Sequence, residues 1–135
     1  MTTQQSNPEV SRRAVTRYRL RTAVLAVVAA EMAYLLLRYG AGFDLSLRDG
    51  PSVGPAAVAV SAGAAALAGW ALLAVLERVT ARARRIWTIV AAVVFVVSLL
   101  GAAGGASAAA ILGLSILHAV VAAVLITGLP CGCRG

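Results

Sequence analysis

The sequence predicts an all-α polytopic membrane protein, a bundle of four transmembrane helices. Four long apolar runs and the placement of the arginines between them carry this prediction. Hydrophobic residues make up 61% of the 135 residues, charged residues make up 13%, and the mean hydropathy is +0.90. Such a composition is far from that of an ordinary soluble domain and is typical of a chain embedded in a bilayer.

Each apolar run is close to the roughly 20 residues that a helix needs to cross about 30 Å of hydrocarbon. The segments outside the runs are short, so one membrane domain accounts for the chain. A basic segment, residues 1–19, precedes it, and a tail, residues 130–135, follows it. The predicted helices span residues 20–39, 53–76, 86–103 and 106–129.

The basic residues are distributed unequally between the predicted loops. All twelve are arginine, and the net charge is +7. The positive-inside rule therefore places both termini in the cytoplasm of a multi-pass protein of the bacterial cytoplasmic (inner) membrane. Attraction to anionic headgroups at the cytoplasmic face explains the clusters better than binding to nucleic acid. Ten arginines fall on the predicted inner side (Arg12, Arg13, Arg17, Arg19, Arg21, Arg78, Arg82, Arg84, Arg85, Arg134) and two on the outer side (Arg38, Arg48).

The first run is predicted to stay in the protein and not to be a cleaved signal peptide. It is longer than an ordinary signal-peptide core of about 7–15 residues, and it contains Glu31. The arginine-rich segment before it could continue as a short interfacial helix. The loop that follows, residues 40–52, is the only outer segment long enough to hold a ligand. Its alternating Phe43, Leu45 and Leu47 could form a strand-like flap, but the shortness of the pattern favours a loop that dips into the interface.

The second run carries small residues at helical spacing. Ser61, Ala65 and Gly69 fall on one stripe of the helix, which allows close approach of another helix of the bundle or of a second copy. Trp70 lies seven positions before Glu77, or roughly 10 Å inside the membrane boundary at helical rise. That depth is greater than expected for an interfacial tryptophan, so its indole N–H needs a partner.

Polar side chains within the four runs are the candidates for a functional site, because they are costly in hydrocarbon and usually face the interior of a bundle. Glu31 and His118 both lie roughly 15 Å from the cytoplasmic edge by helical rise. Ser98 is about one turn further out. The full set of intramembrane candidates is Glu31, Tyr34, Ser98, Ser115 and His118.

The shared depth of Glu31 and His118 predicts that the two side chains face each other. A structural hydrogen bond between the first and the last helix is the favoured interpretation, since interhelical polar contacts are common in membrane bundles. The alternative is a proton relay in which each group tunes the other's titration.

The sequence contains no signature of an enzyme, and no cofactor or metal is expected. Residues 101–105 are glycine-rich but join two membrane helices, so they do not form a phosphate loop. Cys131 and Cys133 cannot make a four-ligand zinc site alone, and the cytoplasm disfavours a disulfide between them. Glu77 is interpreted as the partner of Arg78 in an ion pair at the end of the helix.

Several segments together resemble an uncharacterised actinobacterial family of small four-helix integral membrane proteins, a domain of unknown function. The resemblance covers about residues 15–130 and supports the fold and the membrane location, but it implies no activity. It rests on residues 53–58 (VGPAAV), 69–78 (GWALLAVLER), 83–88 (ARRIWT) and 118–129 (HAVVAAVLITGL).

Two classes of function remain. The chain is expected to be a structural or interaction protein that acts by helix–helix association, as a homo-oligomer or with a membrane partner protein. The alternative is a small proton-coupled transporter or channel subunit that uses Glu31 and His118. The strong arginine asymmetry argues against the antiparallel dual-topology arrangement of small multidrug exporters, which needs nearly balanced loops.

Overall fold

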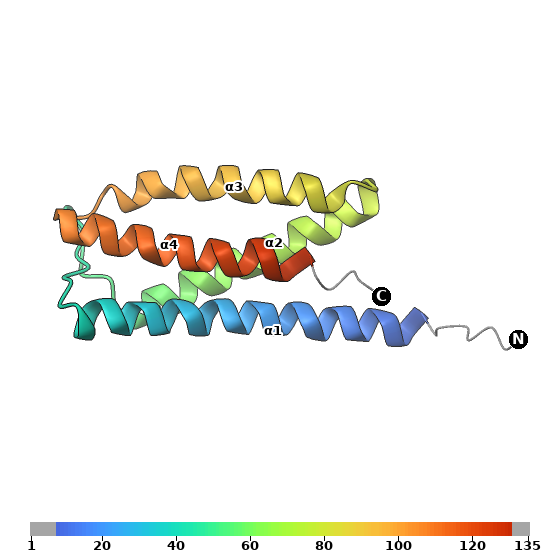
Figure 1. Ribbon diagram of the computed structural model, residues 1–135, viewed down its shortest axis with the longest axis horizontal. Helices are drawn as coiled ribbons and strands as arrows, with labels where there is room; N and C mark the ends of the chain where they lie inside the picture. The colour runs from blue at the N-terminus through green and yellow to red at the C-terminus, as the bar shows by residue number, and fades with distance from the viewer. Residues whose placement is uncertain (1–7, 131–135) are drawn as a thin grey trace, which may run out of the picture.

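The computed structural model describes residues 8–130 and confirms the all-α fold. Its four α-helices are α1 (Pro8–Leu35), α2 (Pro55–Val79), α3 (Ala83–Ala102) and α4 (Ala108–Gly128), and α1 continues into a π-helical turn, η1 (Leu36–Gly40). All four are long and apolar enough to cross a membrane. They run up and down in one bundle, with consecutive helices antiparallel (Figure 1).

Helix α1 differs most from its predicted bounds. Prediction placed its start at residue 20, whereas the helix begins at Pro8 and includes the basic segment. Its 28 residues are about 42 Å long, so α1 extends past the other helices at the end where α2 joins α3 (Figure 1). Arginine is a good helix former, so the segment continues as helix beyond the apolar run. The other three helices begin and end within three residues of the predicted limits.

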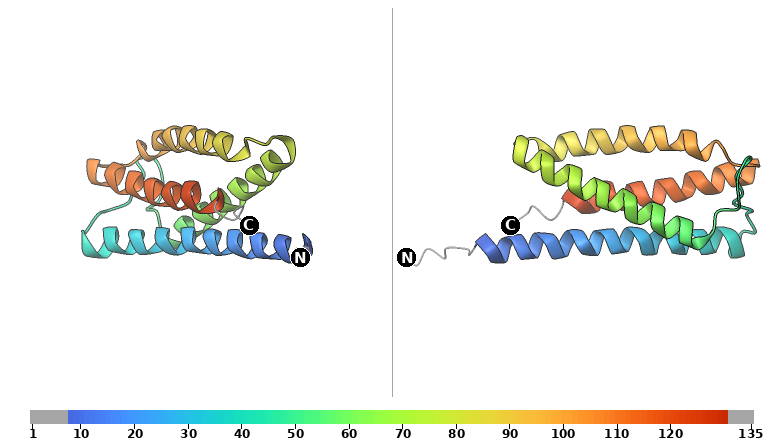
Figure 2. Two further views of the ribbon diagram at one scale, coloured as in Figure 1. Left: turned by 45° about the vertical axis from the view of Figure 1, so that its right-hand side comes forward. Right: turned by 180° about the vertical axis from the view of Figure 1, so that it is seen from behind.

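The helices pack unequally. Helix α1 packs on both α2 and α4, and α3 packs on α4 on the far side of the bundle from α1. Helix α2 runs obliquely across the bundle, from a start beside α1 to its junction with α3 (Figure 2). As a result, α2 lies beside α3 mainly near that junction and diverges from it toward the other end.

Small residues allow the close packing of α1. Ala26 and Ala30 of α1 and Ala62 and Ala66 of α2 are all at most 4% exposed. At the other contact of α1, a Cβ added to Gly128 of α4 would collide with Thr22. In a bilayer the hydrophobic effect does not drive helices together, so such van der Waals contact between close backbones is a main source of stability.

The outer loop between α1 and α2 closes one end of the bundle. It forms no strand; two isolated bridges join Ser46 to Ser52 and Leu47 to Gly105. Leu45 is 1% exposed and packs with Tyr34, Leu114 and other residues of the core. The segment is therefore a loop and not a strand-like flap, and Leu45 packs in the protein core, where the sequence predicted a loop that dips into the membrane interface.

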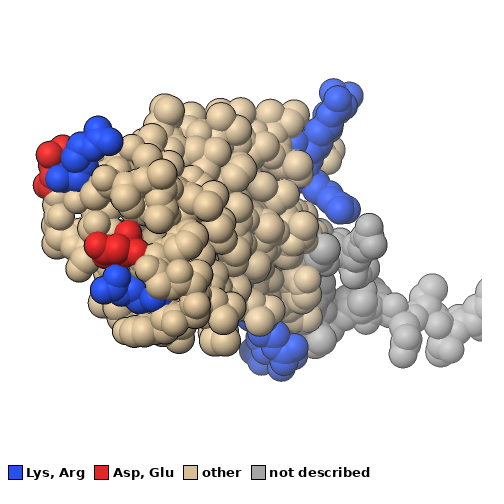
Figure 3. Space-filling model, turned by 60° about the vertical axis from the view of Figure 1, so that its left-hand side comes forward, with Lys and Arg blue, Asp and Glu red and all other residues tan. Residues whose placement is uncertain are grey.

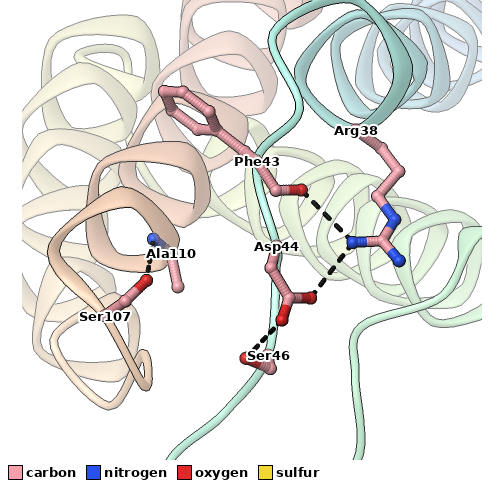
Figure 4. Close-up of polar contacts among 6 residues, drawn as sticks. All are labelled: Arg38, Phe43, Asp44, Ser46, Ser107 and Ala110. Atoms are coloured by element: carbon pink, nitrogen blue, oxygen red, sulfur yellow. Dashed lines mark hydrogen bonds and ion pairs between the residues drawn. The ribbon is translucent and has the colours of Figure 1, made fainter.

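Polar contacts fix the conformation of this loop. Arg38 Nη1 contacts Asp44 Oδ1 at 3.1 Å and donates to the carbonyl oxygen of Phe43 at 3.4 Å (Figure 4). Ser46 Oγ donates to the other carboxylate oxygen of Asp44. Nearby, Ser107 caps α4 by accepting a hydrogen bond from the backbone N–H of Ala110.

Candidate functional site

The described arginines and aspartates lie at the two ends of the bundle. The space-filling view shows arginines at both ends and no charged side chain on the broad band of that face between them (Figure 3). Arg38, Asp44, Arg48 and Asp49 belong to the loop end. Arg82, Arg84 and Arg85 are exposed at the opposite end, beside the α2–α3 turn. The predicted separation of ten inner from two outer arginines therefore corresponds to two opposite ends of one molecule, except that Arg134 lies outside the described residues.

A partly buried ion pair joins α1 to the end of α2. Arg19 Nη2 contacts Glu77 Oε1, and the two side chains are 5% and 31% exposed. Sequence reasoning assigned Glu77 to its neighbour Arg78 instead, and Arg78 is exposed. Arg19 lies on the same face of α1 as Thr22 and Ala26, which are buried between the helices. That shared face is a signal by which the sequence could have identified Arg19 as an inward-facing charge.

Glu31 lies at the border between the packed and the lipid-facing sides of α1. One turn before it, Val27 lies 4.0 Å from the position of a Cβ on Gly63 of α2, so Glu31 is on the α2 side. Its side chain is partly buried, and its Oε1 atom is fully buried without a hydrogen-bond partner among the described residues. The exposed Val24, Val28 and Leu35 flank it on α1.

The predicted hydrogen bond between Glu31 and His118 is not formed. His118 Nδ1 lies 2.7 Å from the carbonyl oxygen of Leu114, one turn earlier on α4. Equal depth therefore did not make Glu31 and His118 partners. The reason is rotational: Glu31 borders α2, whereas His118 lies on the side of α4 that lines a space between α2 and α3.

The contact with Leu114 determines the tautomer of His118. A carbonyl oxygen only accepts hydrogen bonds, so Nδ1 must carry the proton. In the neutral imidazole, Nε2 then keeps a free lone pair at the far edge of the ring.

A lateral groove of about 700 Å³ separates α2 from α3, and α4 forms its floor. Its lining is apolar except for Trp87, Ser61, Ser98 and His118. Exposed residues of α2 contribute to the lining, including Ala65 and Ala68, so the groove opens sideways toward the bilayer. The volume lies within the range of roughly 300–1,000 Å³ that is usual for ligand pockets.

The small-residue stripe of α2 lies along this groove, and its members differ in exposure. Ser61 and Ala65 are exposed and line the open part. Gly69 is buried, and a Cβ at this position would lie 2.8 Å from Cη2 of Trp87. The groove therefore closes where Trp87 packs on Gly69. Trp70, predicted as the deep tryptophan in need of a partner, is partly buried and packs beside this cluster.

Trp87 is the functional candidate that sequence reasoning missed. It is 4% exposed, and its buried Nε1 has no hydrogen-bond partner among residues 8–130. Trp87 is the fifth residue of α3 and follows two arginines, a pattern that is typical of a tryptophan at the membrane interface. The pattern therefore does not predict that this side chain faces the interior.

The three remaining intramembrane candidates contact residues of the core or of their own helix. Tyr34 is 5% exposed and belongs to the core cluster near the outer loop. Ser115 Oγ donates to the carbonyl oxygen of Ile111 at 2.7 Å, a contact within α4. Ser98 makes a similar contact with Phe95 but also lines the groove. Cys131 and Cys133 lie outside the described residues.

One family model matches most of the chain. A family of unknown function, DUF6069, matches residues 10–134. The chain belongs to this family. Neither a curated protein nor a solved structure matches the chain. DUF6069 membership agrees with the resemblance to an uncharacterised family, and it supplies no activity, so the function must be argued from the geometry.

Proposed function

We propose that this chain is a non-enzymatic integral protein of the bacterial cytoplasmic membrane that acts by association of transmembrane helices, and that a second copy is its partner. The observation that carries the proposal is Glu31, a partly exposed carboxyl group within an apolar span, whose Oε1 has no hydrogen-bond partner among residues 8–130. An intramembrane carboxyl group without a partner is costly, and such groups usually pair within a bundle or an assembly.

A second copy fits the chemistry at Glu31. A neutral carboxylic acid has one donor and further acceptor capacity, so two of them can hydrogen-bond reciprocally across a two-fold axis. The chain has no lysine, and the described arginines lie at the two ends of the bundle, which leaves no arginine or lysine of a second copy at this depth. Val24, Val28 and Leu35 would supply the apolar contact around the pair.

Association is tested by energy transfer between donor- and acceptor-labelled copies diluted in liposomes. We expect Glu31→Leu to weaken dimerisation about tenfold, because an interhelical hydrogen bond in a bilayer contributes roughly 1–2 kcal/mol. Glu31→Gln should weaken it little, because an amide also both donates and accepts. Met32→Leu, at the next position and exposed, is the matched control.

Two results would refute this role. Energy transfer that is absent in the unmodified protein excludes the dimer, and transfer that survives Glu31→Leu removes Glu31 from it. Proton flux into the same liposomes that Glu31→Gln abolishes would instead support the competing function, a proton-coupled transporter.

The proposed orientation has both termini in the cytoplasm, where the arginine clusters contact anionic headgroups. The support is the arginine excess at the end where α2 joins α3. Single cysteines at Asp49 and Ala81, both exposed, test it in a background in which Cys131 and Cys133 are serine. In intact cells we expect an impermeant thiol reagent to label residue 49 and not residue 81. The reverse pattern would invert the topology.

A further inference from the structure

We propose that the lateral groove between α2 and α3 is a binding site for an uncharged, elongated membrane-dissolved molecule that carries a hydroxyl group. This goes beyond the association described above and does not depend on Glu31. One unpaired polar atom in a largely apolar groove carries the inference, Nε2 of His118 near the middle of the groove. Trp87 forms the inner end of the groove.

Hydrocarbon alone would leave Nε2 of His118 without a hydrogen-bond donor. His118 Nε2 can only accept in the tautomer that Leu114 fixes, and no described residue donates to it. Ser98 Oγ already donates to Phe95, so it too offers the groove an acceptor. A guest that donates one hydrogen bond therefore complements the floor of the groove, because the cost of an unpaired polar group is highest in a medium of low dielectric constant.

The position of His118 restricts the class of guest. It lies 11 residues from Ser107 and 11 from Leu129, or roughly 16 Å from each end of α4. A phospholipid headgroup stays at the interface, so its chain could fill the groove but not donate to His118. An ammonium group would be costly at this depth. A neutral hydroxyl on a long apolar molecule meets both constraints.

The shape of the groove agrees with such a guest. Trp87 closes the inner end against Gly69, and the small side chains of Ser61, Ala65 and Ala68 leave the side toward the bilayer open. The guest can enter laterally from the hydrocarbon, without crossing an aqueous phase.

Binding is tested with farnesol, an uncharged 15-carbon alcohol, and with its methyl ether, which has the same chain but no donor. The protein is held in liposomes with Trp70→Phe, so that Trp87 is the only tryptophan and reports on the groove. We expect saturable fluorescence changes for both probes, with about tenfold tighter binding of the alcohol, as for one net hydrogen bond of ordinary strength. Equal affinities for the two probes, or no saturable change, would overturn the proposal.

Three variants locate the site. His118→Leu should reduce the affinity for farnesol to that for the ether and leave the ether unchanged. Ala65→Phe should abolish binding of both probes, whereas Ala64→Phe, exposed on α2 but outside the groove, should preserve both. Unchanged preference for the alcohol in a folded His118→Leu variant, or equal effects at residues 64 and 65, would place the binding elsewhere. The comparison of alcohol and ether on the unmodified groove holds even if a variant fails to fold.

Discussion

Gly69→Ala is expected to lower the free energy of unfolding by about 1–3 kcal/mol, the usual cost of overpacking a core. The new methyl group would lie 2.8 Å from Cη2 of Trp87 and 3.3 Å from Cδ1 of Leu129. The indole ring is rigid and buried, so it cannot move aside without displacing α3. Titration with SDS in mixed micelles, followed by circular dichroism, measures the change.

Gly63 of α2 provides the matched control. A Cβ there meets only Cγ2 of Val27, at 4.0 Å, which is ordinary van der Waals contact. Gly63→Ala is therefore expected to be neutral, or to stabilise by up to about 1 kcal/mol through helix propensity. Adding Trp87→Phe should recover part of the loss at Gly69. Equal effects of the two alanine substitutions would show that Trp87 does not pack on Gly69.

Glu77→Ala is expected to cost about 1–3 kcal/mol, because only the Arg19 side of the ion pair is buried and solvent at Glu77 screens the interaction. The change removes the carboxylate that Arg19 contacts, and the Arg19 side chain is only 5% exposed. Because the pair joins the two helices, its loss should also loosen α1. The same SDS titration gives the stability, and hydrogen exchange of α1 reports the loosening.

Arg78→Ala is the control, because Arg78 follows Glu77 directly, is exposed and forms no ion pair within residues 8–130. Exposed ion pairs contribute about 0–1 kcal/mol, so little change is expected there. A double-mutant cycle between Arg19 and Glu77 isolates the coupling energy. If Arg78→Ala destabilises the protein as much as Glu77→Ala, the local ion pair inferred from the sequence would be the correct assignment.

The number of helices and their approximate bounds follow from hydropathy, because the bilayer imposes one length on every spanning helix. This constraint is local, and it needs no knowledge of neighbouring helices. Helix α1 begins before the predicted apolar run for the complementary reason. A helix can continue into water beyond the hydrocarbon, and the apolar run marks only the part that is inside.

The sequence predicted how deep the candidate side chains lie in the membrane, but not which helix each side chain faces. Counting residues from the ends of the helices placed Glu31 and His118 at similar depths, and helical rise is nearly constant. Which helix a side chain faces depends on the rotation and the crossing of its own helix, to which many weak contacts contribute. The oblique path of α2 directs Ser61 and Ala65 into a groove and leaves Glu31 beside α2, out of contact with His118.

The sequence by itself determined the all-α class, the four apolar helices and the separation of the arginines into two ends. Each follows from the cost of placing a residue in hydrocarbon, which is a property of single residues and of their order. Only the tertiary structure decided that Arg19 pairs with Glu77, that Trp87 closes on Gly69 and that His118 lines a groove with an unpaired nitrogen. These are relations between helices far apart in the chain, and they depend on how the side chains of several helices fill one volume together.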